Sequence, residues 1–185
     1  MIKITKSKLE KEFGLIVEHN VVCMGFDTAS RTGWCKASTG PESQDYVEFE
    51  YGWIQVKTTD KYFKYNKYIE ACSSLIRKEY RVVVEETFFG TNAKTFQLLS
   101  RLGGFVYAVA HKHGVGEKWF ALATRARKYL GIKGNMKKEL VQKELIKRLD
   151  LKIKDEDIID AIILSLNGIL LEKVENIDGL KGRLK

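Results

Sequence analysis

Four acidic residues stand at positions where a carboxylate is costly unless it has a partner or a function. Asp27 and Glu85 each end a short apolar run of the kind that forms a buried strand. Asp157 and Asp160 lie three positions apart in a stretch that is otherwise almost entirely aliphatic. On a helix this spacing places both carboxylates on one face, roughly 5–6 Å apart at Cβ.

These carboxylates can act together only if the fold brings them to one place. Gathered acids repel one another, and partial burial raises that cost unless a cation lies between them. Four hard oxygen ligands from three elements suit Mg²⁺ or Mn²⁺, which also keep water and phosphate oxygens in their coordination shell. The pattern therefore predicts a divalent-metal site built from Asp27, Glu85, Asp157 and Asp160.

Most of these acids also have a purely structural explanation. Asp27 can begin an Asx-turn, and Glu85 or its neighbour Glu86 can be an ordinary charge at a strand end. Acids favour a helix N-terminus, and for Asp155 we prefer this capping role. Asp160 resists such an explanation, because it falls one turn into the helix among isoleucines.

The elements that must position these acids follow from the hydrophobic periodicity. Period-two runs predict strands, and apolar residues at helical spacing predict helices. The expected strands are 21–26, 34–38, 46–56, 81–84 and 118–122, and the expected helices are 60–79, 92–113, 124–130, 135–149 and 155–172. The order of the main elements, β-β-β-α-β-α-β-α-α, predicts an α/β fold with a mixed five-stranded sheet flanked by helices.

Such a sheet has to be mixed, with its first, fourth and fifth strands parallel and helices on both faces. Asp27 and Glu85 then reach the same edge, which is where open α/β sheets place their sites. We expect residues 20–172 to form this domain, after an N-terminal arm or short helix at 1–19 and before a flexible tail at 173–185.

The composition favours a folded protein with a polyanionic partner. The 185 residues are 44% hydrophobic, and Lys and Arg exceed Asp and Glu by a formal charge of +8. Nucleic acid is the commonest partner of such a basic domain, although the excess can also be a merely soluble surface. The N-terminus lacks the apolar segment of a signal peptide, and the longest apolar stretch is too short to span a bilayer. We therefore expect a cytoplasmic protein without a membrane partner.

Three motifs in this order resemble those of the RuvC-type Holliday junction resolvases, which belong to the RNase H-like superfamily. They are GFDTASRTGW from Gly25, VEETF from Val84 and DIIDA from Asp157. The likeness runs from about residue 21 to 171 and implies a bacteriophage branch, whose members act in the host-cell cytoplasm. The first motif departs from the family, which usually has Asp-Pro-Gly, whereas here Thr28 and Ala29 follow the acid.

The resemblance carries the acidic ligands over to Asp27, Glu85, Asp157 and Asp160, and a basic catalytic residue over to Lys138. It implies two Mg²⁺ ions, for which Mn²⁺ can substitute, and phosphodiester hydrolysis that leaves 5′-phosphate ends. Lys138 would stabilise charge on the phosphate or orient the water, but it can equally be a solvated lysine on a helix face.

The resemblance also implies branched DNA as the substrate and a two-fold homodimer that makes paired nicks. Basic residues that could line the phosphates are Arg31, Arg125, Arg127, Lys128, Lys133 and Lys137. Phe88 and Phe89 follow the catalytic strand, either as a buried anchor or as a wedge on unpaired bases, with Phe88 favoured as the wedge. The helix from Asn92, with Gly103 and Gly104, is the expected dimer interface, although plain packing explains these glycines as well.

Three other functions remain open. A nuclease of the same fold could act on RNA–DNA hybrid or on flaps, since the acids do not distinguish these substrates. Residues 27–33 also resemble the phosphate loop of actin-like ATPases, but the chain lacks a second subdomain and a glycine loop for adenosine, so no nucleotide cofactor is expected. A non-catalytic basic DNA-binding protein would not need Asp160 inside an aliphatic helix.

Overall fold

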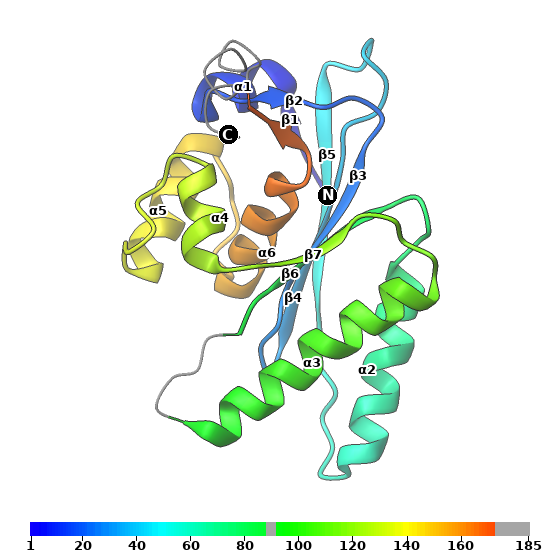
Figure 1. Ribbon diagram of the computed structural model, residues 1–185. Coiled ribbons are helices and arrows are strands. Elements are labelled where there is room, and N and C mark those ends of the chain that lie inside the picture. Colours follow the sequence, from blue (N-terminus) through cyan, green and yellow to red (C-terminus); the bar gives the residue numbers. More distant parts are fainter. Residues whose placement is uncertain (88–91, 173–185) are drawn as a thin grey trace, which may run out of the picture.

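A six-stranded mixed sheet lies between two layers of helices in the computed structural model, which describes residues 1–87 and 92–172 (Figure 1). The strand order across the sheet is β1-β5-β4-β3-β6-β7. Its strands are β1 (Ile2–Thr5), β3 (Val22–Asp27), β4 (Thr32–Ser38), β5 (Tyr46–Ile54), β6 (Arg81–Glu85) and β7 (Lys118–Ala121). The helices are α1 (Lys6–Phe13), α2 (Lys61–Leu75), α3 (Ala93–Lys112), α4 (Ala123–Tyr129), α5 (Lys138–Leu149) and α6 (Glu156–Asn167). Two short strands, β2 (Ile16–Val17) and β8 (Leu170–Leu171), pair separately.

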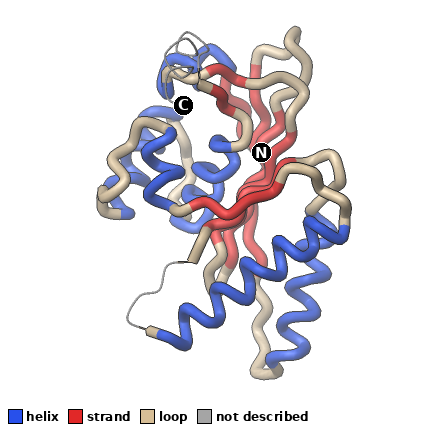
Figure 2. The backbone as a smooth tube through the Cα atoms, in the orientation of Figure 1, coloured by secondary structure: helices blue, strands red, loops and turns tan. Residues whose placement is uncertain are grey.

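The predicted α/β fold and its strand directions are confirmed. Strands β3, β4 and β5 form an antiparallel meander, and β6 and β7 continue the sheet in parallel with β3. Helices cover both faces, with α2 and α3 on one side and α4, α5 and α6 on the other (Figures 1 and 2). The carboxyl ends of β3 and β6 therefore lie at the same edge of the sheet, as expected if Asp27 and Glu85 belong to one site.

The expected strand count was wrong by one. Residues 2–5 of the predicted arm pair antiparallel with the first half of β5 and make a sixth, outermost strand. Residues 2–5 do alternate apolar and polar side chains, but a run of only four residues is a weak strand signal, and the helical spacing of the residues that follow favoured an arm or short helix. The short helix expected in this region is present as α1, capped by the side chain of Thr5.

Helix α6 is shorter than predicted, because it ends at Asn167 rather than at residue 172. Leu170 and Leu171 instead pair with Val17 and Ile16 across the small β2–β8 ladder. In a continuous run of aliphatic residues, hydrophobic periodicity does not mark where a buried helix ends and a buried strand begins. The sequence pattern therefore predicted a single helix over both segments.

Two hydrophobic cores, one on each face of the sheet, fix the helices in place. Phe26 and Val84 belong to the core under α2 and α3, whereas Ile159 and Ile162 of α6 belong to the opposite core. Helix α6 lies directly on β3 because Gly25 has no side chain; a Cβ there would collide with the α6 backbone. No helix in the described part of the chain is long and apolar enough to cross a membrane.

Candidate active site at the carboxyl edge of the sheet

Asp27 and Glu85 lie side by side at the ends of the two central parallel strands. In the β3–β6 pairing Phe26 is opposite Val84, so the following residue of each strand, an acid in both cases, also meets its neighbour. Side chains alternate between the faces of a strand. Phe26 and Val84 enter the α2–α3 core, and the two acids therefore face α6. The same alternation, together with the end of β6 at Glu85, explains why Glu86 is solvent-exposed and faces away.

Helix α6 brings the other two acids to the same place. Asp155 caps the helix, accepting a hydrogen bond from the backbone N–H of Ile158 at 3.2 Å, which confirms its capping role. Asp157 follows in the first turn and lies over β4, where the absence of a side chain at Gly33 makes room for its backbone. One turn later, Asp160 is buried, with 8% of its surface exposed.

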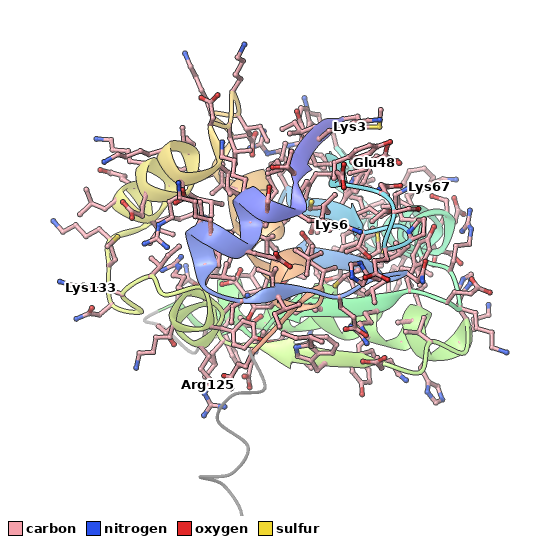
Figure 3. All side chains as sticks on the ribbon, turned by 90° about the horizontal axis from the view of Figure 1, so that it is seen from above. Lys3, Lys6, Glu48, Lys67, Arg125 and Lys133 are labelled. Carbon is pink, nitrogen blue, oxygen red and sulfur yellow. The ribbon has the colours of Figure 1, made fainter. Side chains whose placement is uncertain are left out.

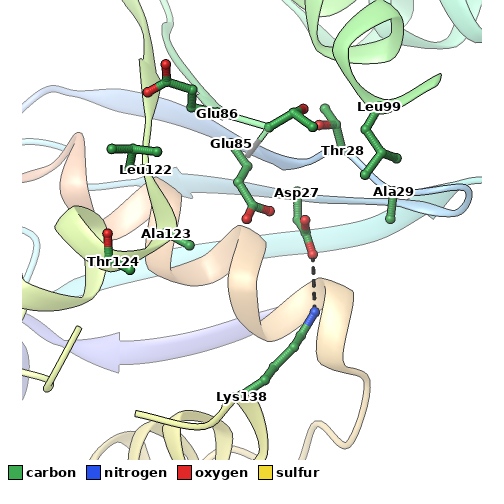
Figure 4. Close-up of a pocket in the computed structure, with 11 residues that line it drawn as sticks. Asp27, Thr28, Ala29, Glu85, Glu86, Leu99, Leu122, Ala123, Thr124 and Lys138 are labelled. Carbon is green, nitrogen blue, oxygen red and sulfur yellow. Dashed lines mark ion pairs between the residues drawn. The ribbon is translucent and has the colours of Figure 1, made fainter. Parts of the chain in front are cut away.

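The ammonium group of Lys138, at the start of α5, lies among three of the acids. Its Nζ is 2.8 Å from an Asp160 oxygen, 3.8 Å from an Asp27 oxygen and 4.0 Å from an Asp157 oxygen. Glu85 points into the same space from the β6 side (Figure 4). The structure thus brings together all four predicted ligands and the predicted basic residue, although they come from β3, β6, α5 and α6.

Asp27 has the most unfavourable environment of the four acids. Its Oδ2 atom is buried and has no hydrogen-bond partner in the described residues, since the Lys138 ammonium remains 3.8 Å away. Burial raises the pKa of Asp27 to about 10, and the neighbouring carboxyl groups of Glu85 and Asp160 add to the shift, while Lys138 opposes it. Without a further cation, these surroundings therefore favour the protonated form of Asp27.

Positive side chains of the protein partly neutralise the remaining acids. Burial disfavours the charge on Lys138, but Asp160, Asp27 and Asp157 together raise its pKa. Arg31, from the β3–β4 turn, donates hydrogen bonds from Nε and Nη2 to Asp157 at 3.1 and 3.0 Å. On the other flank, Arg127 reaches Asp160 at 3.5 Å.

The acids fit a divalent cation by their chemistry, although Asp27, Asp157 and Asp160 form ion pairs with lysine or arginine in the free protein. Within residues 1–87 and 92–172, no three acidic, cysteine or histidine side chains are already arranged as a metal cage. The observation in favour of an ion is the orphaned, buried oxygen of Asp27 next to two more carboxyl groups. Hard oxygen donors of this kind are the ligands that Mg²⁺ and Mn²⁺ prefer. Binding would require Lys138 to move away from Asp160.

A cavity of about 580 Å³ opens beside the acids and gives a ligand access to them. Its lining combines the acids with apolar and small polar side chains. The residues around it are Asp27, Thr28, Ala29, Glu85, Glu86, Thr87, Leu99, Leu122, Ala123, Thr124 and Lys138. The cavity is thus large enough for a nucleotide-sized group.

The basic residues expected to contact phosphate fall into two groups. Those with solvent-exposed side chains are Arg125, Lys128, Lys133 and Lys137. Figure 3 shows Arg125 and Lys133 extending outward at the periphery of the molecule. Arg31 and Arg127 instead contact Asp157 and Asp160, so in the free protein their partners are carboxylates of the acid cluster. Phe88 and Phe89 lie outside the described residues.

The glycines of α3 have different surroundings. Gly103 packs toward Phe120, Val84 and Thr28 within 3.4–3.8 Å of a notional Cβ, which gives it a packing role inside the chain. A Cβ at Gly104 would meet no atom of another described segment within 4 Å, and this glycine is exposed on the outer side of the helix. Only the second glycine could therefore permit close approach of a partner helix.

Two features of the site were not predicted from the sequence. Arg31 bridges Asp155 and Asp157, and the exposed indole of Trp53 lies beside its guanidinium group. Trp53 could have been noticed as a large aromatic residue near a strand end, but the sequence does not show which residue it faces. That information depends on the strand register.

The strand order, the helices on both faces and the acids at one edge define an RNase H-like fold. Neither a model of a protein family nor a curated protein sequence matches the chain. Among solved structures, Thermus thermophilus RuvC in complex with a Holliday junction substrate is similar, with a TM-score of 0.66 and 17% sequence identity over 79% of this chain and 91% of that chain. A second T. thermophilus RuvC structure gives a TM-score of 0.66 and 16% identity, over 82% of this chain and 99% of that one. The protein thus has the RNase H-like fold in the form found in RuvC.

Proposed function

We propose that the protein is a magnesium-dependent endonuclease that cuts branched DNA, four-way junctions in particular, and leaves 5′-phosphate ends. The observation that carries this proposal is the convergence of Asp27, Glu85, Asp157 and Asp160 on one buried space beside a large cavity. The fold shared with a protein whose structure contains a Holliday junction substrate supports the choice of DNA substrate.

In this proposal the four acids hold two Mg²⁺ ions, for which Mn²⁺ can substitute. When bound, such ions activate water and stabilise the attacking and leaving oxygens of a phosphodiester. The chain's own residues supply the rest. Asp27 and Glu85 present their carboxyl groups from a rigid sheet, and Asp160 is fixed by the buried helix around it. This rigidity keeps the ligands in position without the entropic cost of ordering loops.

Lys138 has two roles in succession. In the free protein its ammonium group neutralises part of the acid cluster, at 2.8 Å from Asp160. Once the acids have other cations, Lys138 is free to turn toward the adjacent cavity, which it already lines. There it can stabilise the negative charge that develops on the phosphate during hydrolysis.

DNA binding in this proposal depends on exposed cations and on symmetry. Arg125, Lys128, Lys133 and Lys137 contact backbone phosphates, which position the DNA without reading its sequence. Two nicks placed symmetrically across a junction require two active sites, so we infer a two-fold homodimer. The outer side of α3 around Gly104 is the candidate interface.

A comparison of substrates tests this function. With Mg²⁺, the protein is expected to cut a four-way DNA junction at paired positions and to leave a plain duplex and an RNA–DNA hybrid largely intact. Chelation of the metal with EDTA should stop the reaction. Products are resolved on denaturing gels, and ligation of the nicked junction without prior phosphorylation reports 5′-phosphate ends. Preferential cutting of the hybrid or of flaps would replace this function with another nuclease activity of the same fold.

A further inference from the structure

Trp53, at the end of β5, is an exposed aromatic residue that the proposed chemistry leaves unused. More than half of it, 53%, is accessible to solvent. The strand pairing places Asp27 opposite Gly33 and Gly33 opposite Trp53, so the three form one row across β3, β4 and β5. Residues directly opposite on neighbouring strands share a face of the sheet. Trp53 therefore lies on the same face as the catalytic acids.

The row also gives the separation between Trp53 and the acids. Neighbouring strands are about 4.8 Å apart, so the Cα atoms of Trp53 and Asp27 are about 10 Å apart. The start of α6 fills the gap above Gly33, where the backbone of Asp157 lies. Trp53 and Asp27 thus flank the first turn of α6 on opposite sides.

Arg31 connects this indole to the acid cluster. Its guanidinium carbon is 5.3 Å from the centroid of a Trp53 ring, within cation–π distance. The same guanidinium group is 2.7 Å from Asp155 and 3.0 Å from Asp157. The side chain of Arg31 is 35% accessible to solvent, so a DNA phosphate can compete with these two carboxylates for its guanidinium group.

The end of β5 that carries Trp53 is an open edge of the sheet. Strand β1 pairs only with Tyr46–Phe49, and in the described residues no strand covers the second half of β5 on that side. A flat aromatic ring at an open edge, next to a cation, matches a nucleotide, which offers a base for stacking and a phosphate for the cation.

We propose that Trp53 and Arg31 form a second DNA contact, in which the indole stacks on an unpaired base near the branch point and the guanidinium binds the adjacent phosphate. This inference rests on the proposed function and adds a specificity determinant to it. Bases inside a duplex are already stacked, so the contact favours branched over continuous DNA.

The test compares DNA affinity for Trp53→Ala, Trp53→Phe and a matched control. The control is Tyr46→Ala, at the opposite end of the same strand, where Lys3 lies 4.2 Å from the ring centroid in a similar cation–aromatic pair. Fluorescence anisotropy without divalent metal measures binding of a labelled four-way junction and of a plain duplex of the same length. Thermal unfolding and sedimentation check that each variant is folded and keeps the wild-type oligomeric state.

Trp53→Ala is expected to weaken junction binding at least about fivefold while changing duplex binding by less than about twofold. Trp53→Phe should retain most of the affinity, and Tyr46→Ala should match the wild type. A fluorescent base analogue at the branch point should also change its fluorescence with the wild type but not with Trp53→Ala.

Two results would overturn the inference while the proposed function stands. One is wild-type junction affinity in a folded Trp53→Ala variant, when the wild type itself binds and cuts the junction. The other is a loss of the dimer in Trp53→Ala, which would assign the indole to contact between copies of the chain. Failure of the wild type to prefer the junction over the duplex would instead remove the proposed function.

Discussion

Asp160→Asn is expected to lower the rate of junction cleavage at least about a thousandfold and to leave junction binding within about threefold of the wild type. The substitution keeps the size of the side chain and removes only its charge. Asp160 is 8% exposed, and the Lys138 ammonium lies 2.8 Å from it, so the carboxylate is a central negative charge of the site. Single-turnover cleavage with saturating Mg²⁺ measures the rate, and anisotropy without metal measures binding.

The matched control for this experiment is Asp155→Asn, on the same helix. Asp155 also pairs with a cation, Arg31, but it caps α6 and takes no part in the acid cluster around Lys138. Asparagine is as good an N-cap as aspartate. This variant should retain cleavage within about tenfold of the wild type. Equal losses in both variants would show that charge near the helix start, rather than a ligand at Asp160, determines activity.

Asp27 is expected to make the metal-free protein less stable as the pH rises. Burial raises the pKa of this carboxyl from its ordinary value of 3.8 to about 10, so the folded state holds a proton that the unfolded state releases. Stability is therefore greatest below the ordinary pKa and declines as the pH rises toward the folded-state pKa. The decline attributable to Asp27 therefore continues through neutral pH.

Asp27→Asn isolates this contribution because it cannot ionise. The variant should show a shallower fall in the free energy of unfolding with pH than the wild type, and it should be the more stable of the two at neutral pH without metal. Urea denaturation at several pH values in EDTA gives the slopes. Addition of Mg²⁺ should stabilise the wild type increasingly as the pH rises and leave the variant nearly unchanged. Identical slopes for both proteins would mean that Asp27 is not a buried, protonated acid.

The sequence predicted the framework of the site well, because strand ends and helix spacing are local properties. Asp27 and Glu85 were placed at adjacent strand ends from the order of the elements alone, and Asp157 and Asp160 on one helix face from their spacing. These placements needed only the rules of parallel sheets and helical periodicity. The geometry confirms them, while the metal and the reaction remain proposals.

Features that depend on register or on side-chain competition could not be predicted in the same way. The pairing of β1 with β5 and the row from Asp27 to Trp53 both arise from tertiary contacts between segments distant in sequence. The attachment of Arg31 to Asp157 rather than to solvent likewise reflects the charge of the assembled site. A list of basic residues cannot distinguish a cation that pairs with the acids in the free protein from one whose side chain extends into solvent.

Anomalous diffraction from crystals soaked in Mn²⁺ tests the gathering of the four acids most directly. The expected result is manganese density bound by Asp27 together with Glu85 or Asp160, with a second peak that involves Asp157, and with Lys138 displaced from Asp160. The account is contradicted if saturating Mn²⁺ leaves no anomalous peak among these carboxylates and Lys138 still occupies the position 2.8 Å from Asp160.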